Sequence, residues 1–168
     1  ASRLHLVTIV DPDDSRTWTI AAVGDGVPGF ADGPLATARF REPAGLLLDG
    51  RTLYVADRGN HVIRAIDLDA QFVTTIAGTP ATLGFFGDDG AATDALLFAP
   101  SALALAPNGD LFVADTGNHR VRRVVAGSGI ITTVLGDGVA ASSRSMAPAR
   151  CTSSTSTTTG SAGSASTA

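Results

Sequence analysis

The sequence predicts an all-β protein built from four-stranded antiparallel sheets in tandem. A ten-residue stretch, "VADRGNHVIR" from Val55, returns as "VADTGNHRVR" from Val113, 58 residues later (Asp57 to Asp115). The 168 residues include 19 glycines and 8 prolines, which separate short runs of β-branched and apolar residues. Apolar residues make up 44% and charged residues 17%, which suits the core of one domain. A repeat of short strands with turn signals between them indicates a repeated all-β architecture.

Each repeat divides into four strand-like runs separated by turns such as "PNG" and "TGN". The first copy has these runs at Ala44–Leu48, Thr52–Asp57, His61–Asp67 and Phe72–Ala77. The second copy has them at Ser101–Ala106, Asp110–Asp115, His119–Val125 and Ile130–Leu135. Tandem units of this kind are typical of a β-propeller, with the first strand of each unit innermost.

The expected fold is an incomplete propeller of about two and a half blades. Residues 1–23 hold two runs, "LHLVTIV" and "TWTIAAV", that match only the last two strands of a unit. Residues 24–78 and 79–136 each supply a blade, so the propeller fragment spans 1–138. Closure commonly takes roughly 4–8 blades. We therefore expect a chain that is marginally stable or that self-associates through its open sheet edges.

The C-terminal segment 139–168 is a low-complexity tail rich in Ser, Thr, Gly and Ala. From Cys151 onward it has no large apolar residue with which to form a core, so we expect disorder. A linker, a truncation and an out-of-frame stretch all remain open as its origin. The single cysteine cannot form an internal disulfide and leaves the redox compartment undetermined.

The segment "GDGVPGFADGPLATARFREPAGLLLDGRTLYVADRGNHVIRAID" strongly resembles the NHL repeat family. The hallmark of that family is an apolar strand after Pro, followed by an "LYVAD-x-GN-H-x-I/V-R" hairpin. The resemblance covers Trp18 to about Gly138. It implies a propeller of about six blades, and a function among protein, RNA or glycan binding, with a few relatives being lyases or lactonases. The "FADG" linker is similar to the bacterial branch, which favours an extracytoplasmic or secreted location.

The repeated polar signature is predicted to be structural. With the hairpin centred between Asn60 and His61, Asp57 faces Arg64, and opposite charges across two strands contribute about 0.2–1 kcal/mol. Gly59 and Asn60 suit positive φ in the turn. The signature residues are Asp57, Gly59, Asn60, His61 and Arg64 in the first copy, and Asp115, Gly117, Asn118, His119 and Arg122 in the second.

No catalytic residue, metal ligand or cofactor is assigned from the sequence. His61 and His119 are equivalent but stand one per blade without the three or four converging ligands that a metal needs. "GDGVPG" at Gly24–Gly29 matches G-x-G-x-x-G, but no regular helix follows it. "DPDD" at Asp11–Asp14 and "GDDG" at Gly87–Gly90 match no calcium loop and are explained by turn chemistry.

Charge and composition argue against nucleic acid and membranes as partners. The net charge of −4 provides no sequence-wide basic field, and one Trp and one Tyr leave little aromatic surface for stacking bases. Loop carboxylates such as Asp25 and Asp94 would repel phosphate. No run of 18 apolar residues appears. A protein or glycan partner fits better.

Two loops of about 20 residues, Gly24–Glu42 and Thr79–Ala99, are expected to share one rim with the signature turns. "GFADGPLATARF", ending at Phe40, is matched to "GFFGDDGAATDALLF", ending at Phe98. Leu35, Phe40, Leu96 and Phe98 are expected to fill the gap between blades. The residues predicted to contact a partner are the loop tips Val27, Pro28, Phe30, Asp32, Phe85, Phe86, Asp88 and Asp89.

The leading functional hypothesis is a non-catalytic binding or scaffolding module, because each repeated polar motif has a structural explanation. One alternative is a fragment of a metal-assisted, propeller-type enzyme resembling a lyase or lactonase. Another is a fragment of a longer NHL protein with no function of its own.

Overall fold

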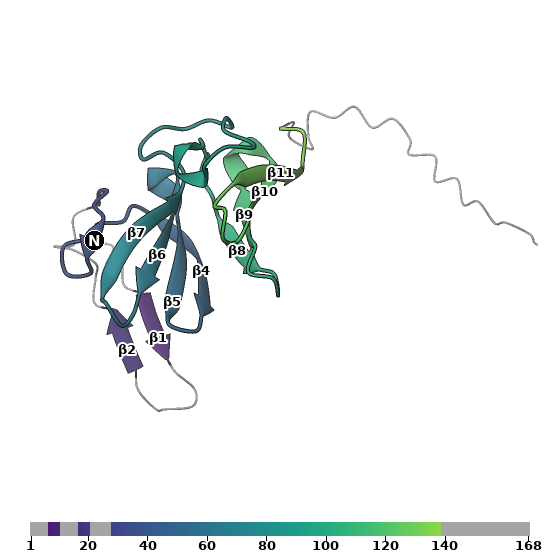
Figure 1. Cartoon of the computed structure of the whole chain (residues 1–168). Helices are drawn as coiled ribbons and strands as arrows, with labels where there is room; N and C mark the ends of the chain where they lie inside the picture. The colour runs from purple at the N-terminus through teal and green to yellow at the C-terminus, as the bar shows by residue number, and fades with distance from the viewer. Residues whose placement is uncertain (1–6, 11–16, 21–27, 139–168) are drawn as a thin grey trace, which may run out of the picture.

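The computed structural model describes residues 7–10, 17–20 and 28–138, which form two larger adjoining antiparallel sheets and a separate two-stranded pair (Figure 1). The first blade contains the strands β4 (Pro43–Asp49), β5 (Thr52–Asp57), β6 (Val62–Asp67) and β7 (Phe72–Ala77). The second blade contains β8 (Ala102–Leu105), β9 (Leu111–Asp115), β10 (Arg120–Val124) and β11 (Ile131–Leu135). Neighbouring strands in each blade are consecutive in sequence. The predicted all-β fold is confirmed, and the two blades do not close into a ring.

Two shorter pairings accompany the blades. β3 (Gly33–Pro34) pairs with β7 at the outer edge of the first blade. β1 (Val7–Val10) and β2 (Thr17–Ile20) form a separate antiparallel pair. Its assignment to a preceding blade stays a prediction, as do the proposed domain boundaries. The "DPDD" turn, Val27 and the tail 139–168 lie outside the described residues.

Each signature turn is a 3₁₀ helix followed by a left-handed histidine. η1 (Arg58–Asn60) ends at His61 with φ 61°, and η3 (Thr116–Asn118) ends at His119 with φ 53°. The sequence-based assignment of positive φ to Gly59 and Asn60 is therefore wrong. The 3₁₀ turn keeps three residues right-handed and leaves the reversal to the residue after it.

The longer turn also shifts the strand register. Asp57 lies opposite Val62 and Val55 lies opposite Arg64, so the predicted pairing of Asp57 with Arg64 across the strands is wrong by two residues. In the second blade Asp115 lies opposite Arg120 in the same way. The charged side chains consequently meet along a diagonal of the hairpin.

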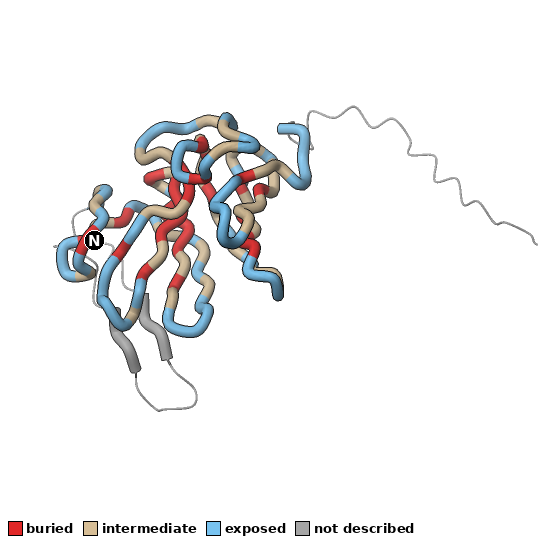
Figure 2. The backbone as a smooth tube through the Cα atoms, in the orientation of Figure 1, coloured by how far each residue is buried: buried red, intermediate tan, exposed pale blue. Residues whose placement is uncertain are grey.

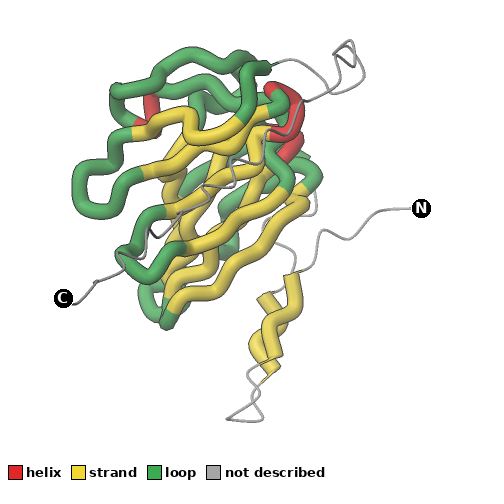
Figure 3. Tube along the Cα trace, turned by 90° about the vertical axis from the view of Figure 1, so that its right-hand side faces the viewer, coloured by secondary structure: helices red, strands yellow, loops and turns green. Residues whose placement is uncertain are grey.

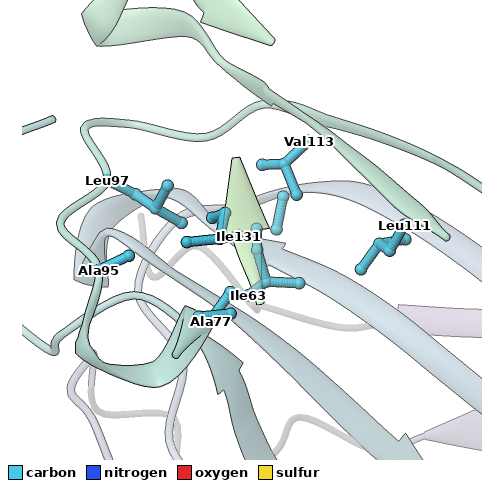
Figure 4. Close-up of a cluster of buried hydrophobic side chains, with 9 residues drawn as sticks. Ile63, Ala77, Ala95, Leu97, Leu111, Val113 and Ile131 are labelled. Atoms are coloured by element: carbon cyan, nitrogen blue, oxygen red, sulfur yellow. The ribbon is translucent and has the colours of Figure 1, made fainter. Parts of the chain in front are cut away.

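The main hydrophobic core lies between the two blades, where buried residues concentrate (Figure 2). Figure 4 shows Ile63 and Ala77 of the first blade meeting side chains that come from the second blade and the loop before it. The buried members of this inter-blade core are Ala56, Ile63, Ala77, Ala92, Ala95, Leu97, Leu111, Val113 and Ile131. Full burial of a Leu, Ile or Val side chain stabilises the fold by about 1.5–3 kcal/mol.

The two innermost strands bring the blades into their closest contact. β4 and β8, one edge strand from each sheet, contact each other where the two sheets meet. Figure 3 shows the strands of both blades side by side with loops at their ends. A Cβ atom on Gly45 of β4 would lie 2.7 Å from the carbonyl oxygen of Ser101, just before β8. Only glycine permits this approach of one backbone to another.

A second hydrophobic cluster covers the opposite face of the first blade. It is formed by Ala38, Phe40, Leu53, Val55, Ile66 and Val73. The loop before β4 contributes Ala38 and Phe40 to it. None of the helices in the described part of the chain is long and apolar enough to cross a membrane.

Candidate functional site

The centre of the signature in the first blade is the buried carboxylate of Asp57. Its Oδ1 accepts a hydrogen bond from the backbone N–H of Arg41 at 2.8 Å. Its Oδ2 accepts one from Asn60 Nδ2 at 2.8 Å and lies 3.2 Å from Arg64 Nη1. Asn60 Nδ2 also donates to the carbonyl of Gly29 at 2.7 Å. The carboxylate and the amide together hold the loop before β4 against the β5–β6 hairpin.

Arg64 is fully buried and adds further contacts between the loop before β4 and the β5–β6 hairpin, which together form a loop-to-hairpin tie. Its guanidinium donates to the carbonyls of Arg39 at 3.0 Å and Ala31 at 2.6 Å. It also pairs with Asp32 at 2.5 Å and lies 4.7 Å from the centres of the Phe30 and Phe40 rings. Two carboxylates and these two carbonyls offset the cost of burying this charge.

The second blade repeats these contacts with its own residues. Asp115 accepts the backbone N–H of Phe98 and the side-chain N–H of Asn118, both at 2.7 Å. Asn118 also donates to the carbonyl of Gly84. Arg122 lies 3.5 Å from Asp115 and 2.7 Å from Asp88, and it donates to the carbonyl of Leu96 at 3.4 Å. The signature is thus the same loop-to-hairpin tie in both blades.

Burial and charge act in opposite directions on the acids of this tie. Burial raises the pKa of Asp57 and of Asp115, against the lowering effect of their hydrogen bonds and of Arg64 or Arg122. Partial burial likewise raises the pKa of Asp88, but contacts with Thr133 and Arg122 outweigh it and hold that pKa below its usual value. The outer carboxylate is therefore held in its charged form by Thr133 together with the buried Arg122 guanidinium.

The glycine of each signature is required by a close approach and not by its φ angle. A Cβ on Gly59 would lie 2.7 Å from the carbonyl oxygen of Arg41. A Cβ on Gly117 would overlap the ring of Phe98 and lie 2.6 Å from its carbonyl oxygen. These same carbonyls accept the N–H groups of Gly59 and Gly117, each at 2.8 Å.

The two signature histidines have different surroundings. His61 Nδ1 accepts the backbone N–H of Ala99 at 3.2 Å, and the His61 ring contacts Phe98 edge-on at 5.5 Å between centres. Ala99 and Phe98 belong to the loop before the second blade, so His61 joins the two blades. His119 is exposed and lines an open hollow of about 250 Å³ on the outer face of the second blade. The hollow is lined by Thr116, His119, Arg120, Val121, Leu135 and Gly136.

The predicted loop-tip residues separate into two groups. Asp32 and Asp88 are ion-pair partners of the buried arginines, so their carboxylates serve the fold. Phe30 lies over Arg64, while Pro28 and Asp89 are exposed. Phe85 and Phe86 stack on each other with ring centres 5.9 Å apart and stay 53% and 74% exposed. Arg120 lies 4.9 Å from the Phe85 ring centre.

The matching of Phe40 with Phe98 is shifted by one residue. Arg41 and Phe98 donate to equivalent aspartates, so Leu97 stands in the place of Phe40. Leu97 is fully buried between the blades, whereas Leu96 and Phe98 are half-buried. Alignment on Pro43 and Pro100 alone would have identified Leu97, because both prolines follow the tied residue by two positions.

In the described part of the chain, no three His, Cys, Asp or Glu side chains gather in a way that could hold a metal ion. The acidic "GDDG" turn places Asp88 on Arg122, which accounts for that carboxylate.

Comparison with known proteins shows which proteins these repeats are similar to. The family model of the Teneurin NHL domain matches residues 77–125. NHL repeat-containing protein 2 of Bos taurus is 37% identical over 97 residues, which is 56% of this chain and 13% of the relative. These matches support an NHL-repeat family for this chain. The chloroplastic protein SUPPRESSOR OF QUENCHING 1 of Arabidopsis thaliana is 38% identical over 109 residues, or 64% of this chain and 10% of the relative.

The chain thus spans only about a tenth of these relatives' length. Among solved structures, an auxiliary nutrient binding protein from Bacteroides thetaiotaomicron superposes with a TM-score of 0.56. That match is 23% identical and covers 76% of this chain and 32% of the other. It supports the propeller-like fold and nothing finer. A bacterial origin for the NHL chain stays a prediction.

Proposed function

We propose that this NHL module is a non-catalytic binding or scaffolding domain that contacts a protein or glycan through loops on one face. The observation that supports the proposal is that, in both blades, the polar signature residues hold the preceding loop against the hairpin. The carboxylates, amides and guanidinium groups of the signature bond to loop backbone or to one another. A group that is buried and bonded to a loop is poorly placed to act on a substrate.

The aromatic pair Phe85–Phe86 is the strongest candidate for the contact itself. Two large rings stacked on each other and largely exposed retain apolar surface that a partner could bury. Aromatic side chains with a neighbouring arginine are frequent anchors of protein interfaces, and ring faces also stack on sugars. The loop is held from behind by Asn118 and Arg122, so the pair is presented on a fixed base.

The experiment uses binders selected from libraries. A random peptide library and a glycan array are screened against the 168-residue chain, and dissociation constants of the hits are measured for the double variant Phe85→Ser/Phe86→Ser. We expect at least about a tenfold loss of affinity, which corresponds to about 1.4 kcal/mol. The matched control is Phe72→Ser, which alters an exposed aromatic on the outer strand β7.

Hits that bind the double variant as tightly as the parent would reject the Phe85–Phe86 pair as the contact surface. Self-association through open sheet edges is a second part of the proposal, although loop residues Asp89 and Gly90 already bond to Ile131 on the outer side of β11.

A further inference from the structure

The interface between the two blades is formed by one face of each. The first blade contributes Ile63, Ala77 and the His61 imidazole, and the loop before the second blade contributes Leu97 and Ala99. A backbone hydrogen bond from Gly78 N–H to the carbonyl of Ala92 at 2.8 Å crosses the same boundary. This interface shows which surfaces two NHL repeats of this chain use to bind each other.

The outer face of the second blade carries the equivalents of the first blade's interface residues. Val121 stands in the place of Ile63, Leu135 in that of Ala77 and His119 in that of His61. Ala77 is fully buried by the second blade, whereas Leu135 is 66% exposed. The hollow lined by His119, Val121 and Leu135 corresponds to the position that Phe98 and Ala99 fill beside His61.

The outer face of the first blade carries the equivalents of the residues that the second blade contributes to the inter-blade interface. Leu46 and Leu48 of β4 are 48% and 49% exposed, while their equivalents Leu103 and Leu105 pack against the inter-blade core. In the loop before β4, Glu42 takes the place of Ala99 and shares its left-handed backbone, with φ of 51° and 48°.

We propose that these two exposed faces bind each other between separate copies of this chain, head to tail. The second blade of one copy would receive the β4 face and the Arg41–Glu42 segment of the next, as the first blade receives the second within one molecule. His119 Nδ1 would then accept the backbone N–H of Glu42. Arg41 and Glu42 carry opposite charges. The Arg41–Glu42 segment would therefore bring no net charge to the side of the interface that faces His119 and Arg120.

A second copy is the occupant because one chain carries the equivalents of both halves of its own inter-blade interface. Joining unlike faces gives a heterologous contact, which extends into longer assemblies or closes into a ring when the rotation permits. The exposed leucines on both faces give the association its hydrophobic driving force.

The test uses two variants that each disable one face, Leu135→Asp and Leu46→Asp. Leu135 is 66% exposed and Leu46 48% exposed, so the folded chain should tolerate each change, which circular dichroism checks. By sedimentation velocity at about 5–100 µM, we expect the parent to form concentration-dependent oligomers and each variant alone to be monomeric. Ala70→Asp, at the exposed β6–β7 turn, is the matched control and should associate like the parent.

The decisive sample is an equimolar mixture of the two variants. The Leu46→Asp chain keeps an intact second-blade face and the Leu135→Asp chain keeps an intact first-blade face, so the mixture should give a 1:1 dimer that does not extend. A parent that is monomeric throughout the range would overturn the proposal. So would association that survives either single variant, or folded variants whose mixture stays monomeric. Val134→Asp repeats the test on the same face if Leu135→Asp fails to fold.

Discussion

Asp57 and Asp115 show that the polar groups of the signature are occupied by structural contacts. Each buried carboxylate accepts a loop N–H and a side-chain amide and lies beside a buried arginine. The sequence alone predicted that these acids and arginines belong together in each hairpin. It could not predict the register, because the four-residue turn with a left-handed histidine differs from a tight two-residue turn only in φ and ψ.

Gly117→Ala tests the close approach in the second blade. The new Cβ would overlap the Phe98 ring and lie 2.6 Å from its carbonyl oxygen, so the loop or the hairpin must shift. We expect a loss of about 1–3 kcal/mol in the free energy of unfolding, measured in urea. Gly90→Ala, whose Cβ would meet only the Gly87 carbonyl at 3.4 Å, is the control and should cost much less.

Asp88→Asn tests the charge of the outer carboxylate as a function of pH. The lowered pKa of Asp88 means that its stabilising effect is present above its usual value of 3.8 and is lost as the pH falls through the lower, folded value. At pH 7 we expect the variant to be less stable by about 0.5–1 kcal/mol, since the Asp88 side chain is 38% exposed. The stability gap between parent and variant should narrow as the pH falls below 3.8, and a gap that is unchanged by acid would refute this assignment. Asp89→Asn, at the exposed neighbour, is the control.

The strands are the elements that the sequence predicted best. Alternating apolar residues and Asn-Gly or Gly-rich turns locate β4 to β11 to within a residue or two of the observed bounds. The loops before each blade were harder to predict, because their shape comes from contacts with the next hairpin and not from local pattern. The tie to Asp57 or Asp115 fixes which residue faces inward, and an alignment that ended on the phenylalanines missed it by one.

Asn118→Ala tests whether the loop before the second blade depends on this tie. The variant removes hydrogen bonds to Asp115 and to the Gly84 carbonyl, which should cost about 1–3 kcal/mol. We expect hydrogen exchange to accelerate first in the loop residues Gly84–Leu97. Asn108→Ala loses contacts only within its own turn and serves as the control. Uniform acceleration over both blades, with no preference for the loop, would contradict a local tie.

At the scale of the whole molecule, we expect the core between the blades to make the two sheets unfold as one cooperative unit. The first blade presents a small buried surface, Ile63 and Ala77, and the second blade inserts Leu97, Val113 and Ile131 against it. Repeat proteins gain much of their stability from such nearest-neighbour interfaces. The outer faces of the two blades expose residues whose equivalents pack between the blades.

Leu97→Ala tests this coupling. Removal of a fully buried leucine should cost about 2–5 kcal/mol, and amides in β6 and β10 should lose protection together because both blades depend on the shared core. Leu83→Ala, which alters a largely exposed leucine of the connecting loop, should stay close to the parent. Loss of protection confined to the second blade would show that the blades unfold independently.

Backbone hydrogen exchange at Arg41 and Phe98 tests most directly the claim that the NHL signature is a structural tie. These amides donate to the buried carboxylates of Asp57 and Asp115. In the parent chain both should exchange far more slowly than in an unfolded peptide, and Asp115→Ala should accelerate Phe98 much more than Arg41. Exchange of both amides at unprotected rates in the folded parent would contradict the account.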